Sequence, residues 1–342
     1  LVESVRAITP RGVWESRRLP GSGAGPSPDR ALIGSEGILG AITDAWVRVR
    51  PRPRFKASCG VEFDDFLAAA AAVRELSQSG LNPSNCRLLD ALEAATTGAG
   101  SGERSLLVLG FESAHHPVDH PMSLAIEIAR THGGIPGEVR IQGPPGDADA
   151  RATAGRNVVP PAGARAEQSP VGSRAEQPAV DAWRSAFLLA PYLRDTFVAC
   201  GVLSDTFETA ITWDRFEELH ATAMEAVRSK VAEVCGAPAE GPGAPRVTCR
   251  FTHVYPDGPA PYFTVLAPAV RGGEVEQWDE IKAAASEAVI EGGGTITHHH
   301  AVGRDHRPWY DRQRPDPFAA ALRAAKAELD PAAVMNPGVL VD

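Results

Sequence analysis

Alternation of apolar and polar residues near the start of the chain predicts short extended segments. We expect such segments at 1–8, 31–34 and 41–49, with a loop rich in glycine, proline and serine at 20–28 between the first two. Pro51 and Pro53 follow the third segment and end it, because proline has no N–H to donate to a β-ladder.

Strands and helices alternate along the rest of the chain. The alanine-rich stretch 64–78 predicts a helix that begins at Asp64 as N-cap and ends at Gly80. The apolar run 105–111 is typical of a buried strand, and Gly133 closes a helix. Two sets of strands and helices around one antiparallel sheet indicate an α+β fold. The expected strands are 54–63, 86–93 (with a turn), 105–111, 247–254 and 262–269, and the expected helices are 64–78, 121–132, 213–235 and 274–290.

The segment 137–180 differs in composition from its surroundings. It is rich in glycine, proline, alanine and charged residues, has almost no large apolar side chains, and contains a short repeat of the form Arg-Ala-Glu-Gln at 165–168 and 174–177. A segment that can bury so little apolar surface does not offset its ordering entropy. We expect a disordered insertion or linker here, with ordered structure resuming at Ala182 and Trp183.

Composition narrows the class of protein. A net charge of −9 argues against a general nucleic-acid binder, which would carry a basic face. No apolar run reaches the length of a membrane span, and the first residues carry too much charge for a signal peptide. Five cysteines without a C-x-x-C pair favour a reducing cytoplasm rather than a disulfide framework or structural zinc. Because Leu1 is not methionine and lies in an apparent strand, we expect that the N-terminus is missing.

Three glycines in the stretch Gly34-Ser35-Glu36-Gly37-Ile38-Leu39-Gly40 are spaced by three residues. Glycine lets the backbone approach a ligand closely, and exposed amides can receive phosphate or adenine groups. A structural turn explains the spacing equally well, because glycine is the default residue of tight turns.

The run His298-His299-His300 carries the most chemistry in the chain. Imidazoles exchange protons near neutral pH. The arginines that follow have the fork geometry that holds carboxylates and phosphates. A metal tract and a solvated loop are the alternatives, whereas an expression tag would lie at a terminus. A metal site at His115, His116 and His120 is disfavoured, because intervening prolines break any common helical face and no fourth ligand is evident. The arginines are Arg304, Arg307, Arg312 and Arg314.

The amino-acid sequence of residues 31–51, ALIGSEGILGAITDAWVRVRP, resembles the last segment of the FAD-binding domain in flavoproteins of the vanillyl-alcohol oxidase type. The ending from Leu329 to Gly338 is also similar to the C-terminus of that family, and the resemblance covers nearly all of the chain outside 137–180. It implies an FAD cofactor and an α+β fold in three parts. These parts are a C-terminal remnant of the FAD-binding domain at 1–54, a cap domain with a helix-flanked antiparallel sheet at 55–290, and a segment at 291–342 that returns to the FAD domain. The residues implied to bind FAD are Ser35, Glu36, Gly37, Ile38, Leu39, Gly40, Ala41 and Ile42.

The histidine run discriminates among branches of that superfamily. Lactate and glycolate dehydrogenases usually carry a Gly-Glu-His-Gly-Ile-Gly type of motif at this place, whereas Thr297 to Gly303 resembles the alkyldihydroxyacetonephosphate synthases. Further stretches match that branch: 190–195 with 203–209, 249–255 with 261–263, and 86–90. The resemblance implies that Tyr262, His298, His299 and His300 are catalytic, and that Arg194, Arg87 and Thr206 bind substrate, although the family often has serine where Thr206 stands.

That branch exchanges a fatty acyl group for a fatty alcohol on dihydroxyacetone phosphate through a covalent flavin adduct, without net redox change. The resemblance therefore implies a small phosphate or carboxylate substrate with a possible lipid tail, and a possible homodimer. Charge, hydropathy and ligand spacing in the sequence predict no nucleic-acid partner, no transmembrane segment and no metal site. Two alternatives remain at this point. One is an FAD-dependent oxidase or dehydrogenase of a hydroxy acid or related alcohol. The other is a non-catalytic remnant that binds lipid phosphate or a protein partner, because the diphosphate-gripping loop of the FAD domain is absent from the sequence.

Overall fold

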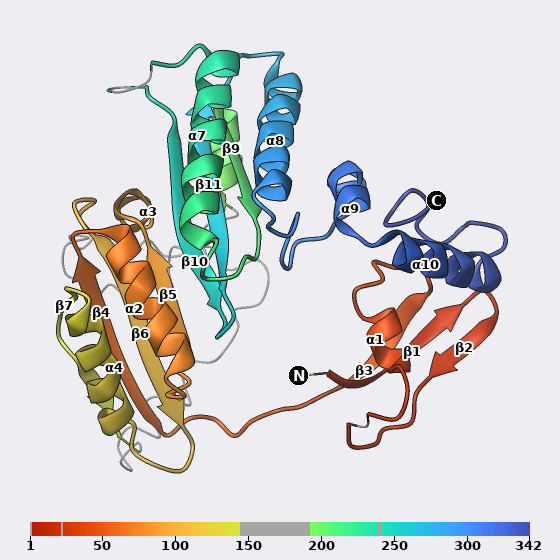
Figure 1. The fold of residues 1–342 in the computed structure, drawn as a ribbon, viewed down its shortest axis with the longest axis horizontal. Coiled ribbons are helices and arrows are strands. Elements are labelled where there is room, and N and C mark those ends of the chain that lie inside the picture. The colour runs from red at the N-terminus through yellow and green to blue at the C-terminus, as the bar shows by residue number, and fades with distance from the viewer. Residues whose placement is uncertain (1, 22, 144–191, 239–240, 242) are drawn as a thin grey trace, which may run out of the picture. The chain divides into compact units, whose positions relative to one another are not determined.

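The computed structural model describes residues 2–21, 23–143, 192–238, 241 and 243–342 (Figure 1). The chain forms two compact units. The first unit comprises Leu1–Pro51, Glu208–Ala210 and Ala283–Asp342, and the second comprises Arg52–Phe207 and Ile211–Lys282. The expected insertion at 144–180 and the expected resumption at Ala182 lie outside the described residues.

A three-stranded antiparallel sheet in the order β2-β1-β3 forms the base of the first unit. Its core combines Val5 and Ala7 of β1 and Ile38 of the glycine turn with Val339 and Val341 at the other end of the chain. Burial of these side chains therefore joins both termini of the chain in one unit, since apolar surface from each is removed from water by the other. The elements are β1 (Val2–Thr9), β2 (Gly12–Glu15), α1 (Pro28–Leu32), β3 (Ala41–Val47), α9 (Arg307–Gln313) and α10 (Asp316–Leu329).

The expected extended piece at 31–34 is wrong. Residues 28–32 form α1, with Pro28 in its first turn and the Ser27 hydroxyl accepting the Arg30 N–H at 3.3 Å. Proline suits the first helical turn because its missing N–H would have no intrahelical partner there. The signal was present in the sequence as a serine followed by proline.

The second unit contains an eight-stranded sheet, and β7-β4-β6-β5-β10-β11-β9 is its strand order, with β8 also pairing with β4. Adjacent strands whose register is known run antiparallel, which confirms the predicted antiparallel sheet flanked by helices. The strands are β4 (Phe55–Phe63), β5 (Asn85–Leu89), β6 (Ser105–Ser113), β7 (Ile135–Pro136), β8 (Arg140–Gln142), β9 (Val202–Glu208), β10 (Arg246–Val254) and β11 (Pro259–Pro268).

Two details of the second unit correct the sequence analysis. Asp65, not Asp64, caps α2, because its carboxylate accepts the Ala68 N–H at 2.7 Å, while Asp64 pairs with Arg104. The start of the expected insertion, 137–143, is ordered, because β8 pairs with β4 there. The helices are α2 (Phe66–Gln78), α3 (Ala91–Thr96), α4 (Asp119–Thr131), α7 (Phe216–Cys235) and α8 (Glu274–Glu291), whose second half belongs to the first unit.

The two faces of the large sheet have different character. Val61, Leu107 and Phe251 point to the face covered by α2 and α4 and form the main core there. On the opposite face, which we call the α3 face, Arg87 lies beside Val108, and Arg250 lies between Leu89 on β5 and Tyr262 on β11. Cross-strand partners share a face of a sheet, so this register gathers the polar candidates on one side. A small apolar cluster with α3 covers part of that face and consists of Leu89, Ala94, Leu106 and Val108.

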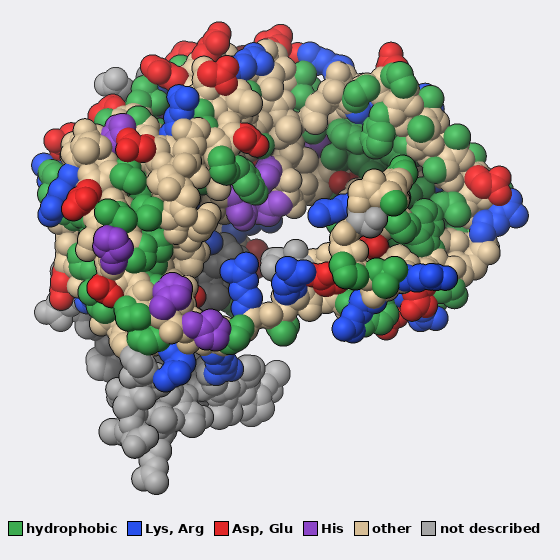
Figure 2. Space-filling model, turned by 60° about the horizontal axis from the view of Figure 1, so that its bottom comes forward, with side chains coloured by type: hydrophobic (Ala, Val, Ile, Leu, Met, Phe, Trp, Pro, Cys, Tyr) green, Lys and Arg blue, Asp and Glu red, His purple; other side chains and the backbone are tan. Residues whose placement is uncertain are grey.

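None of the described helices is long and apolar enough to cross a membrane. Figure 2 shows basic and acidic side chains interspersed on the face in view.

Candidate active site

Tyr262 is held on the α3 face by a hydrogen bond across two strands. Its phenol lies 2.9 Å from the Thr206 hydroxyl on β9. The Thr206 backbone is fixed in turn, because the Lys282 ammonium donates to its carbonyl at 2.7 Å and pairs with Asp205 at 2.7 Å. Two residues predicted separately, one as catalytic and one as substrate-binding, are therefore neighbours in the second unit.

Arg250 lies against the ring of the same tyrosine. Its guanidinium carbon is 3.9 Å from the centroid of the Tyr262 ring, which is a cation–π contact. The guanidinium also binds the carboxylate of Glu93, which is buried, and reaches the Thr264 hydroxyl at 3.3 Å. Thr248 donates to that carboxylate as well. Sequence reasoning missed both Arg250 and Glu93, because the pair joins residues 157 positions apart.

Asp90 caps α3 and connects it to β10. Its carboxylate accepts the N–H of Glu93 at 2.7 Å and the N–H of Cys249 at 2.5 Å. Burial raises the pKa of Asp90 from 3.8 to about 6, although these two backbone donors act in the opposite direction. The helix that positions Glu93 is thus anchored by an acid that titrates near neutral pH.

Arg87 adds a second cation to the α3 face. Burial lowers its pKa, and the nearby charge of Arg250 lowers it further. Arg87 also lines a cavity of about 940 Å³ together with Lys56 and Arg140. The Thr252 hydroxyl, at the wall of that cavity, is buried and has no hydrogen-bond partner among the described residues. Glu112 also lines this cavity and pairs with Lys56 at 2.9 Å, so the lining carries both signs of charge, and the Arg87 guanidinium is the group there that suits an anionic, oxygen-rich ligand.

Arg194 lies apart from these groups. It is exposed, in a helical stretch at 192–199. It makes no ion pair or hydrogen bond with any residue that the structure describes, and no contact with Tyr262 or Arg87 is recorded there. Its predicted role in holding an anion stays a prediction.

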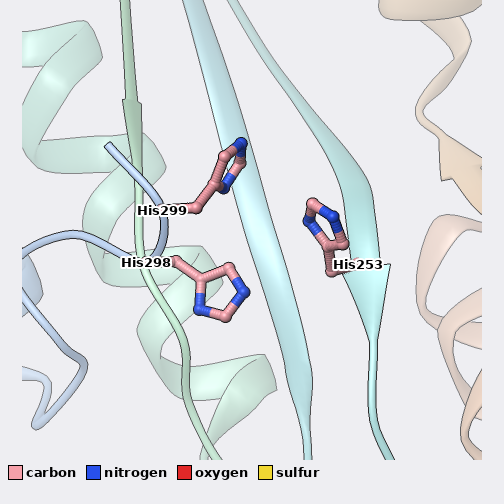
Figure 3. Close-up of side chains that lie close together, drawn as sticks. All are labelled: His253, His298 and His299. Atoms are coloured by element: carbon pink, nitrogen blue, oxygen red, sulfur yellow. The ribbon is translucent and has the colours of Figure 1, made fainter. Parts of the chain in front are cut away.

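The three histidines lie in the first unit, on the loop that follows α8. Figure 3 shows the rings of His298 and His299 on this loop; their centroids are 5.7 Å apart and the rings are nearly perpendicular. The rings of His299 and His300 are 5.2 Å apart. The figure also draws His253, which stands on β10 in the second unit. The sequence prediction named the histidines but not what holds them.

A buried glutamate at the end of β9 holds the histidine loop. One carboxylate oxygen of Glu208, Oε1, accepts the backbone N–H groups of His298 at 3.2 Å, His299 at 2.6 Å and His300 at 2.5 Å. The other oxygen, Oε2, lies 2.7 Å from Nδ1 of His299. The Glu208 side chain is 2% exposed, whereas the two neighbouring imidazoles are half exposed. Sequence reasoning quoted Glu208 within a substrate-binding stretch but assigned it no role.

The charge of this glutamate is stabilised by the loop. Burial alone would raise the pKa of Glu208, but the N–H donors of His300 and His299 and the two imidazoles outweigh burial, and the pKa lies below its ordinary value. For His298, burial lowers the pKa; the charge of Glu208 opposes this effect and His299 adds to it. Glu208 is therefore a carboxylate at neutral pH.

Metal binding is the other chemistry that these groups suggest. A carboxylate oxygen of Glu208 and ring nitrogens of His299 and His300 lie within 4.8 Å of one another, which is near the spacing of a divalent-cation site. However, Oε1 of Glu208 already accepts three backbone N–H groups, and Oε2 lies at hydrogen-bond distance, 2.7 Å, from Nδ1 of His299. The geometry matches a hydrogen-bonded loop better than a coordination shell.

A second glutamate holds the far end of the histidine loop. The carboxylate of Glu36 accepts the N–H groups of Val302 at 2.7 Å and Gly303 at 2.9 Å, and the Asn336 amide donates to the Glu36 carbonyl. Glu36 itself has a positive φ of 49°, a backbone conformation that residues other than glycine rarely adopt. Gly40 is required by packing, because a Cβ there would lie 2.9 Å from the carbonyl of Ile8.

The predicted FAD-binding stretch, 35–42, is partly buried: the side chain of Ser35 is buried, whereas those of Ala41 and Ile42 are exposed. The side chains of Ile38 and Leu39 are buried in the core of the first unit, and Ile42 is on β3. Gly34 has φ +87° and no atom within 4 Å of the position where a Cβ would lie, so one side of the turn is unobstructed. A turn of this kind fits FAD, whose phosphate and carbonyl groups are bound well by main-chain amides. Which of these residues contact the cofactor stays a prediction.

Comparisons with known proteins agree with this arrangement. Residues 52–340 match the family model described as FAD linked oxidases, C-terminal domain. Alkyldihydroxyacetonephosphate synthase of Trypanosoma brucei brucei is 25% identical over 346 residues, covering 100% of this chain and 52% of the relative. The enzyme of the same name from Caenorhabditis elegans is 26% identical over 373 residues, covering 100% of this chain and 55% of the relative. The chain thus spans about half the length of the curated relatives it matches.

Solved structures show the same fold. A structure of alkyldihydroxyacetonephosphate synthase superposes with a TM-score of 0.66 at 19% identity, over 98% of this chain and 53% of that protein. The resemblance to flavoproteins that was stated from the sequence is confirmed, and FAD is the cofactor of the matched family. Since the family model covers most of the chain, from residue 52 to residue 340, this chain belongs to the FAD-linked oxidases as their C-terminal domain.

Proposed function

We propose that this chain is the C-terminal part of an FAD-dependent enzyme of the alkyldihydroxyacetonephosphate synthase type. Such an enzyme replaces the acyl group of an acyl dihydroxyacetone phosphate by a fatty alcohol. The fatty acid leaves, the alcohol oxygen forms the new C–O bond, and no electrons are exchanged overall. The similarity to about half the length of synthases of this name supports the proposal, because on this chain it extends through both units.

The observation that carries the proposal is the arrangement around Tyr262. Its hydroxyl is hydrogen-bonded to Thr206, its ring is stacked on Arg250, and Arg87 adds a partly buried cation on the same face. A phenol held in this way can exchange a proton with a substrate carbon or oxygen at Oη. The neighbouring cations favour a substrate that carries a phosphate.

The other chain groups have supporting roles in this proposal. FAD, when bound, supplies the electron-sink chemistry. The histidine triplet carries protons or orients the phosphate, and Arg87 and Arg194 hold anionic groups. Main-chain groups of 35–42 contact the cofactor. Each of these roles uses residues that the sequence analysis named.

The test is a transfer assay with the complete protein that carries this chain, loaded with FAD. An acyl dihydroxyacetone phosphate and an isotopically labelled long-chain alcohol are supplied, and labelled alkyl dihydroxyacetone phosphate is the expected product, with release of one fatty acid for each alkyl group incorporated. The flavin spectrum should be unchanged after turnover.

A parallel arm addresses oxidation. Under anaerobic conditions the same protein is mixed with 2-hydroxy acids, and its flavin absorbance is followed. Rapid bleaching by a hydroxy acid, together with no label transfer, would contradict the proposal and favour an FAD-dependent dehydrogenase. The charge of Arg87 alone does not discriminate the two substrates, because guanidinium binds carboxylate and phosphate alike.

A further inference from the structure

The two carboxylate oxygens of Glu208 have different partners. Oε1 receives the backbone N–H groups of His298, His299 and His300, and the Thr297 hydroxyl lies 3.2 Å from the same oxygen. Oε2 faces the ring of His299, 2.7 Å from Nδ1. One oxygen therefore fixes the course of the loop and the other fixes one imidazole.

The charge of Glu208 decides where the hydrogen of that imidazole lies. An ionised carboxylate is an acceptor only, so a ring nitrogen at 2.7 Å from it must carry a hydrogen. With Nδ1–H bonded to Glu208, the neutral ring of His299 has its lone pair on Nε2. The proton that His299 gains or gives is then the one on Nε2.

His299 is distinguished from its neighbour by this contact. Nδ1 of His300 lies 3.8 Å from the nearest Glu208 oxygen, which is beyond hydrogen-bond distance. The loop cannot easily shift to bring His300 into the same relation, because Glu36 holds the N–H groups of Val302 and Gly303. Both ends of the loop are thus tied to carboxylates within the first unit.

We infer that Glu208 is a positioning residue that holds His299 in the tautomer with hydrogen on Nδ1, so that His299 is the member of the triplet that exchanges a proton through Nε2. The part of this inference that concerns turnover rests on the proposed function. The part that concerns the tautomer does not, since it follows from the charge and the contacts of Glu208.

The first measurement is the tautomer itself. The complete protein is labelled with ¹⁵N-histidine, the His299 signals are assigned with a His299→Gln variant, and ring ¹⁵N shifts are recorded without substrate at a pH where the ring is neutral. The expected result is a protonated Nδ1 and an unprotonated Nε2. A protonated Nε2 in the unsubstituted protein would overturn the inference without any Glu208 variant.

The second measurement uses Glu208→Gln. Glutamine keeps the size of the side chain and one oxygen for the backbone donors, but its amide NH₂ would face Nδ1 and donate to it. The hydrogen of His299 should therefore move to Nε2 in this variant. Turnover should fall by about 10²–10⁴-fold, as when a triad aspartate is replaced by asparagine, while FAD binding is retained. Glu287→Gln, which removes a carboxylate from a surface pair with Arg312, is the matched control and should change neither.

The outcomes separate the two proposals. If the tautomer of His299 is the same in Glu208→Gln as in the unsubstituted protein, or if turnover does not fall, the inference is wrong. If the tautomer switches but no alkyl group is transferred by the unsubstituted protein, the proposed function fails and the positioning of His299 by Glu208 stands. A stoichiometric divalent cation, found by elemental analysis and lost in Glu208→Gln, would show coordination by Glu208, His299 and His300 and would also overturn the inference.

Discussion

Asp90 gives the second unit a pH dependence that a single substitution should remove. Its carboxylate is the N-cap of α3 and also accepts the Cys249 N–H, so it ties the helix that carries Glu93 to β10. Asp90→Asn keeps the shape and a favourable N-cap residue type. It removes the ionisation while the rest of the unit is unchanged.

The magnitude follows from the pKa. Burial raises the pKa of Asp90 from 3.8 to about 6, and each pKa unit is worth about 1.4 kcal/mol. A raised pKa means that the folded state binds the proton more tightly than the unfolded state does. The stabilisation is therefore complete below pH 3.8 and is lost as the pH rises through 6, a total of about 3 kcal/mol in the free energy of unfolding.

Urea unfolding followed by tryptophan fluorescence, at steps from pH 4 to pH 7.5, measures this difference. Asp90→Asn should lower stability at pH 4, because the amide NH₂ meets the Cys249 N–H where a carboxyl oxygen accepted it, at a cost of about 1–3 kcal/mol. As the pH rises, the unsubstituted protein should lose about 3 kcal/mol that the variant does not lose, so the variant should become as stable as the unsubstituted protein or more stable. A gap that stays constant within about 0.5 kcal/mol across this range would refute the reasoning, because only the ionisation of Asp90 makes the gap depend on pH.

Three further substitutions test other parts of the structure. Tyr262→Phe should lower turnover in the transfer assay by about 10²–10⁴-fold with the flavin spectrum retained, because it removes the hydroxyl that Thr206 positions. The control Tyr255→Phe should have little effect on turnover. Normal turnover in Tyr262→Phe would contradict the assignment of Tyr262 as catalytic. Arg87→Gln should raise the KM of the phosphate substrate by about 10-fold or more with a smaller change in kcat, measured by initial rates over a range of substrate concentrations. An unchanged KM would show that Arg87 does not bind the phosphate. Gly40→Ala should destabilise the first unit by about 1–3 kcal/mol in thermal unfolding, because its Cβ would lie 2.9 Å from the Ile8 carbonyl, and an unchanged Tm would show that the turn relaxes.

Local patterns in the sequence predicted most elements correctly and failed where two local signals competed. The strand at 54–63 and the helix ending before Gly80 are predicted within one or two residues. An alternating or alanine-rich pattern favours one backbone conformation locally, without contributions from distant residues. The apolar run before Gly34 predicts an extended segment, whereas Ser27 and Pro28 mark the start of a helix, and the helix is what forms. Burial of the short segment 28–32 against the core of the first unit does not depend on a long periodic pattern, so periodicity alone could not identify it.

The site residues were predicted in part. Motif resemblance named Tyr262, Thr206 and the histidine triplet, and the first two are indeed in contact. It did not give a role to the charged residues that hold them, Glu208, Glu93 and Arg250. These residues carry no motif of their own, because their importance lies in being buried next to a particular partner.

The sequence by itself determined the periodicity of strands and helices, the glycine turn, and the wording that places the chain among the FAD-linked oxidases. Only the tertiary structure decided which charges meet. Glu208 and His299 are 91 residues apart, and Glu93 and Arg250 are 157 residues apart. Local propensity acts over a few residues and has no information on such pairs. They are selected when strand register and burial bring both partners out of water, where an unpaired charge would cost several kcal/mol.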